Sequence, residues 1–285
     1  MKLLWLLYDD VDFAVNQGFA RMMQERGEPL GLQVEAVVLS SVVLGMDAEG
    51  NPVCYKDGQP SHPDAVLSRQ RDMPVSEHFE RMGIPVFNNS IVCRICNDKR
   101  ATHQFLQGLP MPETVFLRSD AKEPPAGTVF PVVLKPACSH GGDRVLVANN
   151  VDEWKAAAAR ILPEPALQQA VVTEAGQDLR VYVLGGKILA GVMRTARSGV
   201  VSNFKQGGQV TLHELTFEER QLAQTVIDRF EKAGAPLHMA GVDLLYDHGR
   251  PVIGEVEDVV GSRMLYNTST IDIVALYLEH ISSLL

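Results

Sequence analysis

The residue types best suited to chemistry lie in the last third of the chain, where three carboxylates fall in two neighbouring apolar segments. Asp243 lies in the first segment, and Glu255 and Glu257 lie in the second. The polar turn between them contains Gly249, and this pattern predicts a β-hairpin. A turn centred on Gly249 makes Asp243 and Glu255 cross-strand neighbours and puts Glu257 on the same face. A hard divalent cation would relieve their mutual repulsion, and Mg²⁺ bridging nucleotide phosphates is the usual case. The alternative is that one carboxylate points to solvent and the others cap turns.

Two lysines are candidates for binding the phosphates of such a nucleotide. Lys135 follows the apolar run Val132–Leu134, where an ammonium group is costly unless it reaches water or an anion. The polar, glycine-containing loop Ser139–Asp143 comes directly afterwards and could offer backbone N–H groups to phosphate oxygens. Lys99 lies early in a predicted helix. On these residues alone, a strand-end lysine that extends to solvent remains the alternative for Lys135.

The cysteines do not indicate a metal site. Cys93 and Cys96 have the spacing of a metal knuckle or a redox pair. Zinc would need two further ligands nearby, and the stretch is instead typical of a helix with Ser90 as its N-cap. We therefore expect buried, reduced thiols.

Composition excludes several classes of function. The chain has 285 residues, 46% hydrophobic and 21% charged, with a formal net charge of −9. This charge argues against non-specific binding to nucleic acid or anionic membranes, which requires a basic face. The apolar run at the N-terminus is too short for a signal-peptide core, and no run reaches the roughly 18 residues of a membrane helix. We expect a cytoplasmic protein, and a homo-oligomer is compatible with the sequence.

The elements that must position these residues follow from periodicity and turn signals. Strands alternate with helices at the start of the chain and predict a parallel α/β domain of about 95 residues. A hairpin is expected around Gly185-Gly186, and the capping box Thr216–Glu219 should open a helix that stops at Gly234. The remaining expected elements are strands at 2–8, 34–39 and 65–67, helices at 12–26 and 151–162, and a terminal helix from about Ile271.

In combination, these segments resemble the ATP-grasp superfamily, most closely the RimK-like carboxylate–amine ligases. The resemblance covers nearly the whole chain from about residue 85. The matching segments occur in the family's order: Asn97–Lys99, Val133–Pro136, Asp178–Val181, Arg194, Ser202-Asn203 with Gly207-Gly208, Asp243, Glu255, position 257 and Thr270–Ile273. The order and spacing of these segments are far more specific than any one of them.

The resemblance implies an ATP-grasp fold of class α/β, with α+β lobes behind an N-terminal parallel α/β domain. The implied limits are 1–97 for the N-terminal domain, 98–168 for a central lid subdomain and 169–285 for the C-terminal subdomain. Each functional role is implied in the same way. The nucleotide would be bound by Lys99, Lys135, Gln168, Gln169 and Asp178. The metal would be bound by Asp243, Glu255 and Glu257, and catalysis would involve Arg180, Arg194 and Asn203. Arg69 and Arg71, after a predicted parallel strand, are candidates for the acceptor site.

The implied reaction uses ATP and Mg²⁺, with Mn²⁺ as an alternative metal. A substrate carboxylate attacks the γ-phosphate, and an amine then displaces phosphate from the acylphosphate to form an amide. The substrates would be small-molecule or peptide carboxylates and amines. The chain departs from the family at Gln168-Gln169, where an acidic hinge residue is common, and at Glu257, where Asn is usual. Two alternatives therefore stay open at this point: a nucleotide-binding module with reduced catalysis, and an ATP-grasp kinase.

Overall fold

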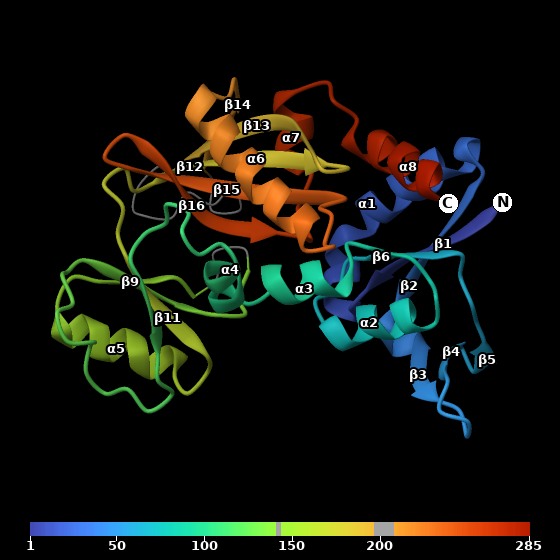
Figure 1. The fold of residues 1–285 in the computed structure, drawn as a ribbon, viewed down its shortest axis with the longest axis horizontal. Coiled ribbons are helices and arrows are strands. Elements are labelled where there is room, and N and C mark those ends of the chain that lie inside the picture. Colours follow the sequence, from blue (N-terminus) through green and yellow to red (C-terminus); the bar gives the residue numbers. More distant parts are fainter. Residues whose placement is uncertain (141–143, 197–207) are drawn as a thin grey trace.

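The computed structural model describes residues 1–140, 144–196 and 208–285. These residues form four β-sheets and their covering helices, arranged as an elongated molecule (Figure 1). The N-terminal elements occupy one end, and the lobe around helix α5 occupies the other. Both chain termini lie at the N-terminal end. Within the described ranges, no helix is long and apolar enough to cross a lipid bilayer.

The N-terminal sheet is parallel, with strand order β2-β1-β6-β7, so the predicted parallel α/β region is confirmed. Helices cover both faces, because α1 buries Met23 beside Leu6 and α2 buries Phe79 beside Leu7. A strand buried on both faces reads as a continuous apolar run, as β1 does. The elements are β1 (Lys2–Tyr8), α1 (Asp10–Gly27), β2 (Leu32–Val38), β6 (Ala65–Ser68), α2 (Met73–Arg81) and β7 (Val86–Phe87).

A small antiparallel sheet, β3-β4-β5, is inserted between β2 and β6 and was not predicted. Its strands are β3 (Val42–Met46), β4 (Pro52–Lys56) and β5 (Gln59–Pro60), and short 3-10 turns at Glu28–Leu30 and Leu39–Ser41 flank β2. The β3 sequence Val-Val-Leu-Gly-Met does not alternate apolar with polar residues, so it lacks the period-2 signal of a half-buried strand.

Two short helices, α3 (Ser90–Cys96) and α4 (Lys99–Phe105), connect the N-terminal region to the rest of the chain. The prediction that Ser90 caps α3 was wrong. Asn89 is the N-cap and accepts from the Val92 N–H, while the Ser90 hydroxyl donates to Glu80. Cys93 and Cys96 lie in α3 as free thiols, and burial raises the pKa of Cys93 to about 12. Among the described residues, they belong to no cluster of three or more metal-binding side chains.

The central lobe is an antiparallel sheet of order β10-β9-β11-β8, covered by α5. Trp154 of α5 is fully buried in the core of this lobe, and Asn150 caps the helix. The elements are β8 (Thr114–Leu117), β9 (Val132–Pro136), β10 (Leu146–Ala148), α5 (Val151–Ile161) and β11 (Ala166–Ala170).

The C-terminal lobe contains a five-stranded antiparallel sheet of order β14-β13-β12-β15-β16. The predicted hairpin around Gly185-Gly186 and the Thr216–Glu219 capping box are both present. The elements are β12 (Gln177–Leu184), β13 (Lys187–Thr195), β14 (Gln209–His213), α6 (Phe217–Lys232), β15 (Met239–Asp247), β16 (Arg250–Glu257), α7 (Arg263–Thr268) and α8 (Ile273–Leu284).

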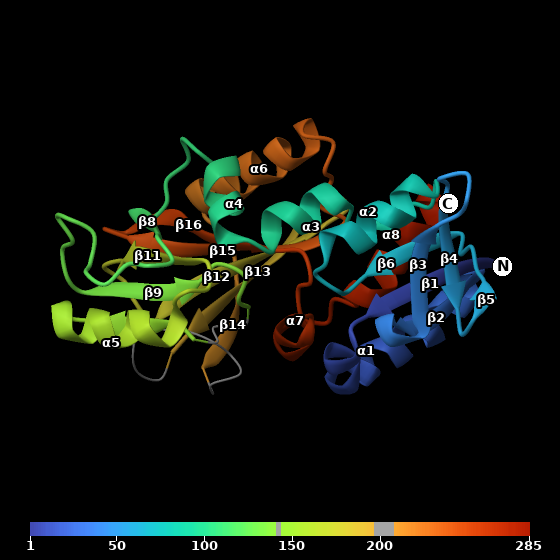
Figure 2. The same cartoon turned by 90° about the horizontal axis from the view of Figure 1, so that it is seen from below.

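The two faces of this large sheet have different roles. Val181 and Val183 point into a core shared with α6 and α3, on the upper side in Figure 2. Tyr182 points the other way, into a core that also contains residues of β1, α1 and α8. Because side chains alternate along a strand, Arg180 lies on the same face as Tyr182. The polar side chains therefore gather on the face opposite α6.

Candidate active site

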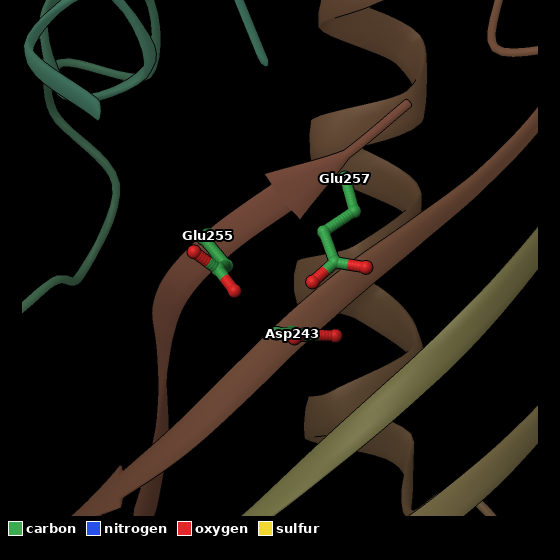
Figure 3. A group of neighbouring side chains, drawn as sticks. All are labelled: Asp243, Glu255 and Glu257. Carbon is green, nitrogen blue, oxygen red and sulfur yellow. The ribbon is translucent and has the colours of Figure 1, made fainter. Parts of the chain in front are cut away.

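The three carboxylates meet because a register shift in the β15–β16 hairpin, beside Gly254, brings Asp243 opposite Glu255 as predicted. Asp243 pairs with Glu255, and the turn residues His248 and Gly249 have φ of 51° and 72°. Two adjacent positive φ values are typical of the tight turn that matches strand twist. Asp243, Glu255 and Glu257 each offer an oxygen, and these oxygens lie within 4.8 Å of one another. Figure 3 shows the two glutamates on one strand and the aspartate on its neighbour.

Two buried arginines offset the charge of Asp243. Arg180 donates to its two oxygens over 2.8 and 2.6 Å, and Arg194 donates to one of them over 2.5 Å. Burial alone would raise the pKa of Asp243, but the two guanidinium groups lower it to about 2. Arg194 also forms an ion pair with Asp178. A Cβ at Gly241 would lie 3.2 Å from Arg180 Nε, so glycine there leaves room for this arginine.

Glu257 lies in a more strained electrostatic position. Burial, together with the neighbouring Asp243 and Glu255, raises its pKa to about 7. Arg180 Nη2 opposes this rise from a distance of 2.8 Å. The two arginines thus do not fully compensate the negative charge of the site. A bound cation would relieve the remaining repulsion between the carboxylates.

The two predicted lysines face the carboxylates from other elements. Lys99 begins α4, which Asp98 caps, and its Nζ lies 3.9 Å from Glu255 Oε2 and contacts the Ser139 carbonyl. Lys135 extends from β9 and donates to Gln169 Oε1 over 2.8 Å. Burial and the neighbouring Lys99 lower the pKa of Lys135 to about 8, against the opposing effect of Glu255. A buried ammonium group beside a second cation is well placed for a polyanion such as a triphosphate.

The hinge residues Gln168 and Gln169 point to opposite faces of β11. Gln169 lies on the Lys135 face and donates to Thr114 Oγ1 over 3.0 Å. Gln168 is buried on the other face, where it accepts from Trp154 Nε1 over 2.7 Å and donates to Thr128. Only the side chain of Gln169 therefore lies next to the lysines.

A cavity of about 590 Å³ brings these groups together. Its walls come from the N-terminal region, the central lobe and the large sheet. The predicted site residues that line it are Lys99, Lys135, Gln169, Asp178, Arg180, Arg194, Asp243, Glu255 and Glu257. Gln168 does not line it but borders a smaller cavity behind β11. Asn203 lies outside the described residues.

The cavity also contains residues that the sequence analysis did not select. Asp258 is buried and accepts hydrogen bonds from Asn97 Nδ2 over 3.1 and 3.0 Å, which ties the end of β16 to the end of α3. Tyr8 and Arg263 line the end formed by the N-terminal region and α7, together with the predicted Arg69 and Arg71. Tyr8 ends a parallel strand, and this position could have identified it from the sequence. Arg263 has no comparable signal.

The sequence model of the RimK-like ATP-grasp domain matches residues 97–281. A "Probable alpha-L-glutamate ligase 2" from Pseudoalteromonas atlantica is 30% identical over 92% of this chain and 90% of its own length. The chain belongs to the RimK-like ATP-grasp family. A "Probable alpha-L-glutamate ligase" from a Marinomonas strain is 31% identical with the same coverage.

Solved structures of this fold are similar along the whole chain. D-cycloserine synthetase DcsG superimposes with a TM-score of 0.70 at 16% identity, covering 99% of both chains. The ATP-grasp ligase PsnB, complexed with a phosphomimetic variant of its minimal precursor, Mg and ADP, gives 0.69 at 15% identity, covering 99% of this chain and 98% of PsnB. The expected ATP-grasp fold is confirmed. As a RimK-like ATP-grasp protein, the chain is an ATP-dependent carbon–nitrogen ligase that joins a carboxylate to an amine and forms ADP.

Proposed function

We propose that L-glutamate is the amine substrate of this ligase, and that a second substrate supplies the carboxylate, either a small molecule or a peptide. The two relatives that match 92% of this chain over 90% of their own length are named as probable glutamate ligases, which supports this choice. The observation that carries the reaction itself is the meeting of three carboxylates and two lysines in one cavity. Oxygen ligands for a divalent cation thus lie beside cations for phosphate.

The donor set fits Mg²⁺, which prefers carboxylate oxygens and keeps part of its water shell. A carboxylate has about four lone-pair sites. Hydrogen bonds from the two arginines occupy three of these sites on Asp243, which leaves the fourth for a metal. Asp243, Glu255 and Glu257 would hold the ion, and its chemistry is to neutralise phosphate charge as the γ-phosphoryl group transfers. Mn²⁺ accepts the same oxygen ligands and would serve as a substitute.

The nucleotide-binding roles follow from position. Lys99 and Lys135 would contact the phosphates. The Gln169 amide, now shared with Lys135 and Thr114, would turn to the adenine ring. Gln168 is bound to Trp154 and Thr128, so we assign its nucleotide contact to backbone groups of the hinge. Asp178 acts by holding Arg194 toward the cavity.

The chemistry then proceeds in two balanced steps. A carboxylate oxygen of the first substrate bonds to the γ-phosphorus as the bond to the β–γ bridging oxygen breaks, releasing ADP. The glutamate nitrogen then bonds to the acyl carbon as the carbon–oxygen bond to phosphate breaks, and the nitrogen loses a proton. Arg180 and Arg194 would stabilise charge on the transferring group. We retain Asn203 as a third catalytic candidate on the basis of its sequence match.

An ADP-release screen tests this proposal. The full chain with MgATP is given candidate carboxylates, including amino acids, dipeptides and peptides, with and without L-glutamate. We expect ADP release that requires both substrates and an amide product that contains glutamate. ADP release without an amine, leaving a stable phosphorylated product, would instead indicate a kinase. Tight MgATP binding without ADP release under any combination would indicate a binding module.

We also propose the domain limits 1–97, 98–168 and 169–285. They are supported by the separation of the parallel, central and C-terminal sheets along the chain. The helices α3 and α4 cross the first of these limits, and α8 returns to pack beside α1. The cytoplasmic location, the compatibility with a homo-oligomer and the absence of a nucleic-acid partner stay predictions.

A further inference from the structure

One end of the cavity is lined by arginines that the proposed nucleotide and metal sites do not use. Arg69 and Arg71 follow strand β6 of the parallel sheet, and Arg263 is the first residue of α7. Tyr8, the last residue of β1, lines the same end. We call Tyr8, Arg69, Arg71 and Arg263 the arginine subsite. Such a concentration of arginine contrasts with the net charge of −9 for the whole chain.

Arg69 is a buried cation without a carboxylate partner among the described residues. It is 5% exposed, and its two terminal nitrogens donate to the Val260 carbonyl, each over 3.2 Å. Its Cζ lies 4.8 Å from the centre of the Phe19 ring. Its Nε has no hydrogen-bond partner in the described part of the chain. A buried guanidinium group with a free donor is costly, and such exceptions call for an explanation.

Tyr8 lies beside Arg69 and adds a second buried donor. Its side chain is 1% exposed, and its hydroxyl has no hydrogen bond of normal geometry within the described ranges. Burial raises the pKa of Tyr8 although the neighbouring Arg69 lowers it, so the hydroxyl remains a donor at neutral pH. A hydrogen bond from Arg69 to the hydroxyl oxygen would still leave the Tyr8 O–H without an acceptor. An anionic ligand would satisfy both, with small side-chain rotations that expose them to it.

The other two arginines extend the subsite toward solvent. Arg71 forms an ion pair with Asp12 over 2.5 Å, which uses one of its nitrogens. Arg263 is exposed and forms no hydrogen bond or ion pair with the described residues. The planar guanidinium group matches a carboxylate through paired N–H donors. The phosphates already have Lys99 and Lys135, which leaves a carboxylate group of the proposed glutamate substrate for this end.

We propose that the arginine subsite binds a carboxylate group of the glutamate substrate and sets the preference for an acidic amine. This inference rests on the proposed function, because that function supplies the glutamate. Arg69 and Tyr8 form the buried base of the subsite. Arg263 closes it from α7, whose start Arg69 positions through the Val260 carbonyl.

The test is equilibrium binding of L-glutamate to the full chain with MgADP present, measured by calorimetry. Arg263→Gln should weaken L-glutamate binding about tenfold, the value expected for loss of a hydrogen bond to a charged group. MgADP affinity and melting temperature should not change, because Arg263 is exposed. Arg250→Gln is the matched control, since Arg250 is an exposed arginine outside the cavity. Glutamate affinity within twofold of that control would overturn the inference.

A second variant probes the buried base without changing charge. Tyr8→Phe removes only the hydroxyl and should weaken L-glutamate binding several-fold, while Tyr55→Phe in β4 should not. Equal binding by both variants would contradict the role of Tyr8.

The proposed function and this inference are tested on different proteins, the first on the parent and the second on its variants. A parent enzyme whose ADP release does not need L-glutamate overturns the proposed function and this inference with it. A glutamate-dependent parent whose subsite variants bind like their controls overturns this inference alone.

Discussion

At the residue scale, the site is held together by charge pairing that is incomplete without a ligand. Arg180 bridges Asp243 and Glu257, and Arg194 bridges Asp243 and Asp178. Buried charges of one sign are tolerated only when partners satisfy them. The arginines satisfy Asp243, whereas Glu257 and Lys135 keep pKa values displaced toward their neutral forms. Those two residues should therefore respond most clearly to substitution.

Glu257→Asn should stabilise the metal-free protein at neutral pH and above. Burial raises the folded pKa of Glu257 to about 7 from its ordinary value of 4.5. Between these values the folded state binds more protons than the unfolded state, so this residue's contribution falls as pH rises. Thermal melts across this pH range should show a steeper loss of melting temperature in the parent than in Glu257→Asn.

The effect on metal binding is separate. Glu257→Ala should weaken Mg²⁺-dependent nucleotide binding more than Glu257→Asn. Parent-like MgATP binding by both variants would remove Glu257 from the metal site.

Lys135→Ala should lose MgATP affinity, by about tenfold or more, while the fold remains intact. The folded pKa of Lys135 is about 8, below its ordinary value of 10.5, because burial disfavours the charged form. Between these values the unfolded state binds more protons, so the contribution of Lys135 to stability increases with pH. At neutral pH its removal should not lower the melting temperature. Calorimetry with MgATP measures the affinity, and Lys187→Ala is the exposed-lysine control. Unfolding of Lys135→Ala would identify a structural lysine.

Local sequence patterns predicted which residues form the site better than they predicted the hydrogen-bond and ion-pair partners of those residues. The hairpin and the positions of Lys99 and Lys135 follow from strand alternation and turn chemistry, which are local, whereas the register shift beside Gly254 was not predicted. The pairing of Arg180 with Asp243 joins residues 63 positions apart and depends on which strands are neighbours. The opposite orientations of Gln168 and Gln169 follow from alternation, but the face that meets the cavity does not. Arg263 carries no local signal, because its role depends on where α7 packs.

At the scale of elements, the hairpin turn and the register shift between Asp243 and Leu244 together align the carboxylates. Gly249 has a φ of 72°, in the left-handed region, so a Cβ there strains the backbone. The correct N-cap of α3 shows the limit of local signals, since Asn89 and Ser90 are both good caps. Glu80 accepts a hydrogen bond from the Ser90 hydroxyl, and Asn89 therefore caps the helix.

Gly249→Ala should therefore destabilise the protein by about 1 kcal/mol, the cost of a left-handed residue with a side chain. Gly18→Ala is the matched control, because Gly18 lies inside α1 and a Cβ there meets nothing within 4 Å. That substitution should stabilise the protein by about 0.5–1 kcal/mol, as expected in an exposed helix interior. Denaturant unfolding of both variants gives the comparison. Equal effects of the two substitutions would mean that the turn is not the source of the strain.

At the scale of the whole molecule, the cavity exists only where three regions meet. Its lining comes from the parallel sheet, the central sheet and the large sheet. The predicted order of domains is compatible with this arrangement, but two features were beyond sequence patterns. The small β3-β5 sheet has irregular burial, and the packing of α8 beside α1 joins opposite ends of the chain. Long-range packing of this kind leaves no periodic signal in either segment.

A ligand that contacts several regions should stabilise them together. Ligand binding to the folded state alone, at about 100 times its dissociation constant, adds about 2.7 kcal/mol of stability. In a protein of this size that corresponds to a rise in melting temperature of about 5 °C or more. We therefore expect MgATP to raise the melting temperature clearly more than ATP with EDTA.

Glu255→Gln should remove this difference between MgATP and ATP with EDTA, because it deletes a proposed metal ligand near Lys99. The ligand-free melting temperature should stay similar, because Glu255 is partly exposed. Glu218→Gln, on the exposed start of α6, is the control and should behave like the parent. If saturating MgATP produces no shift in the parent, or if Glu255→Gln keeps the full Mg²⁺-dependent increment, the carboxylate hairpin is not the metal site.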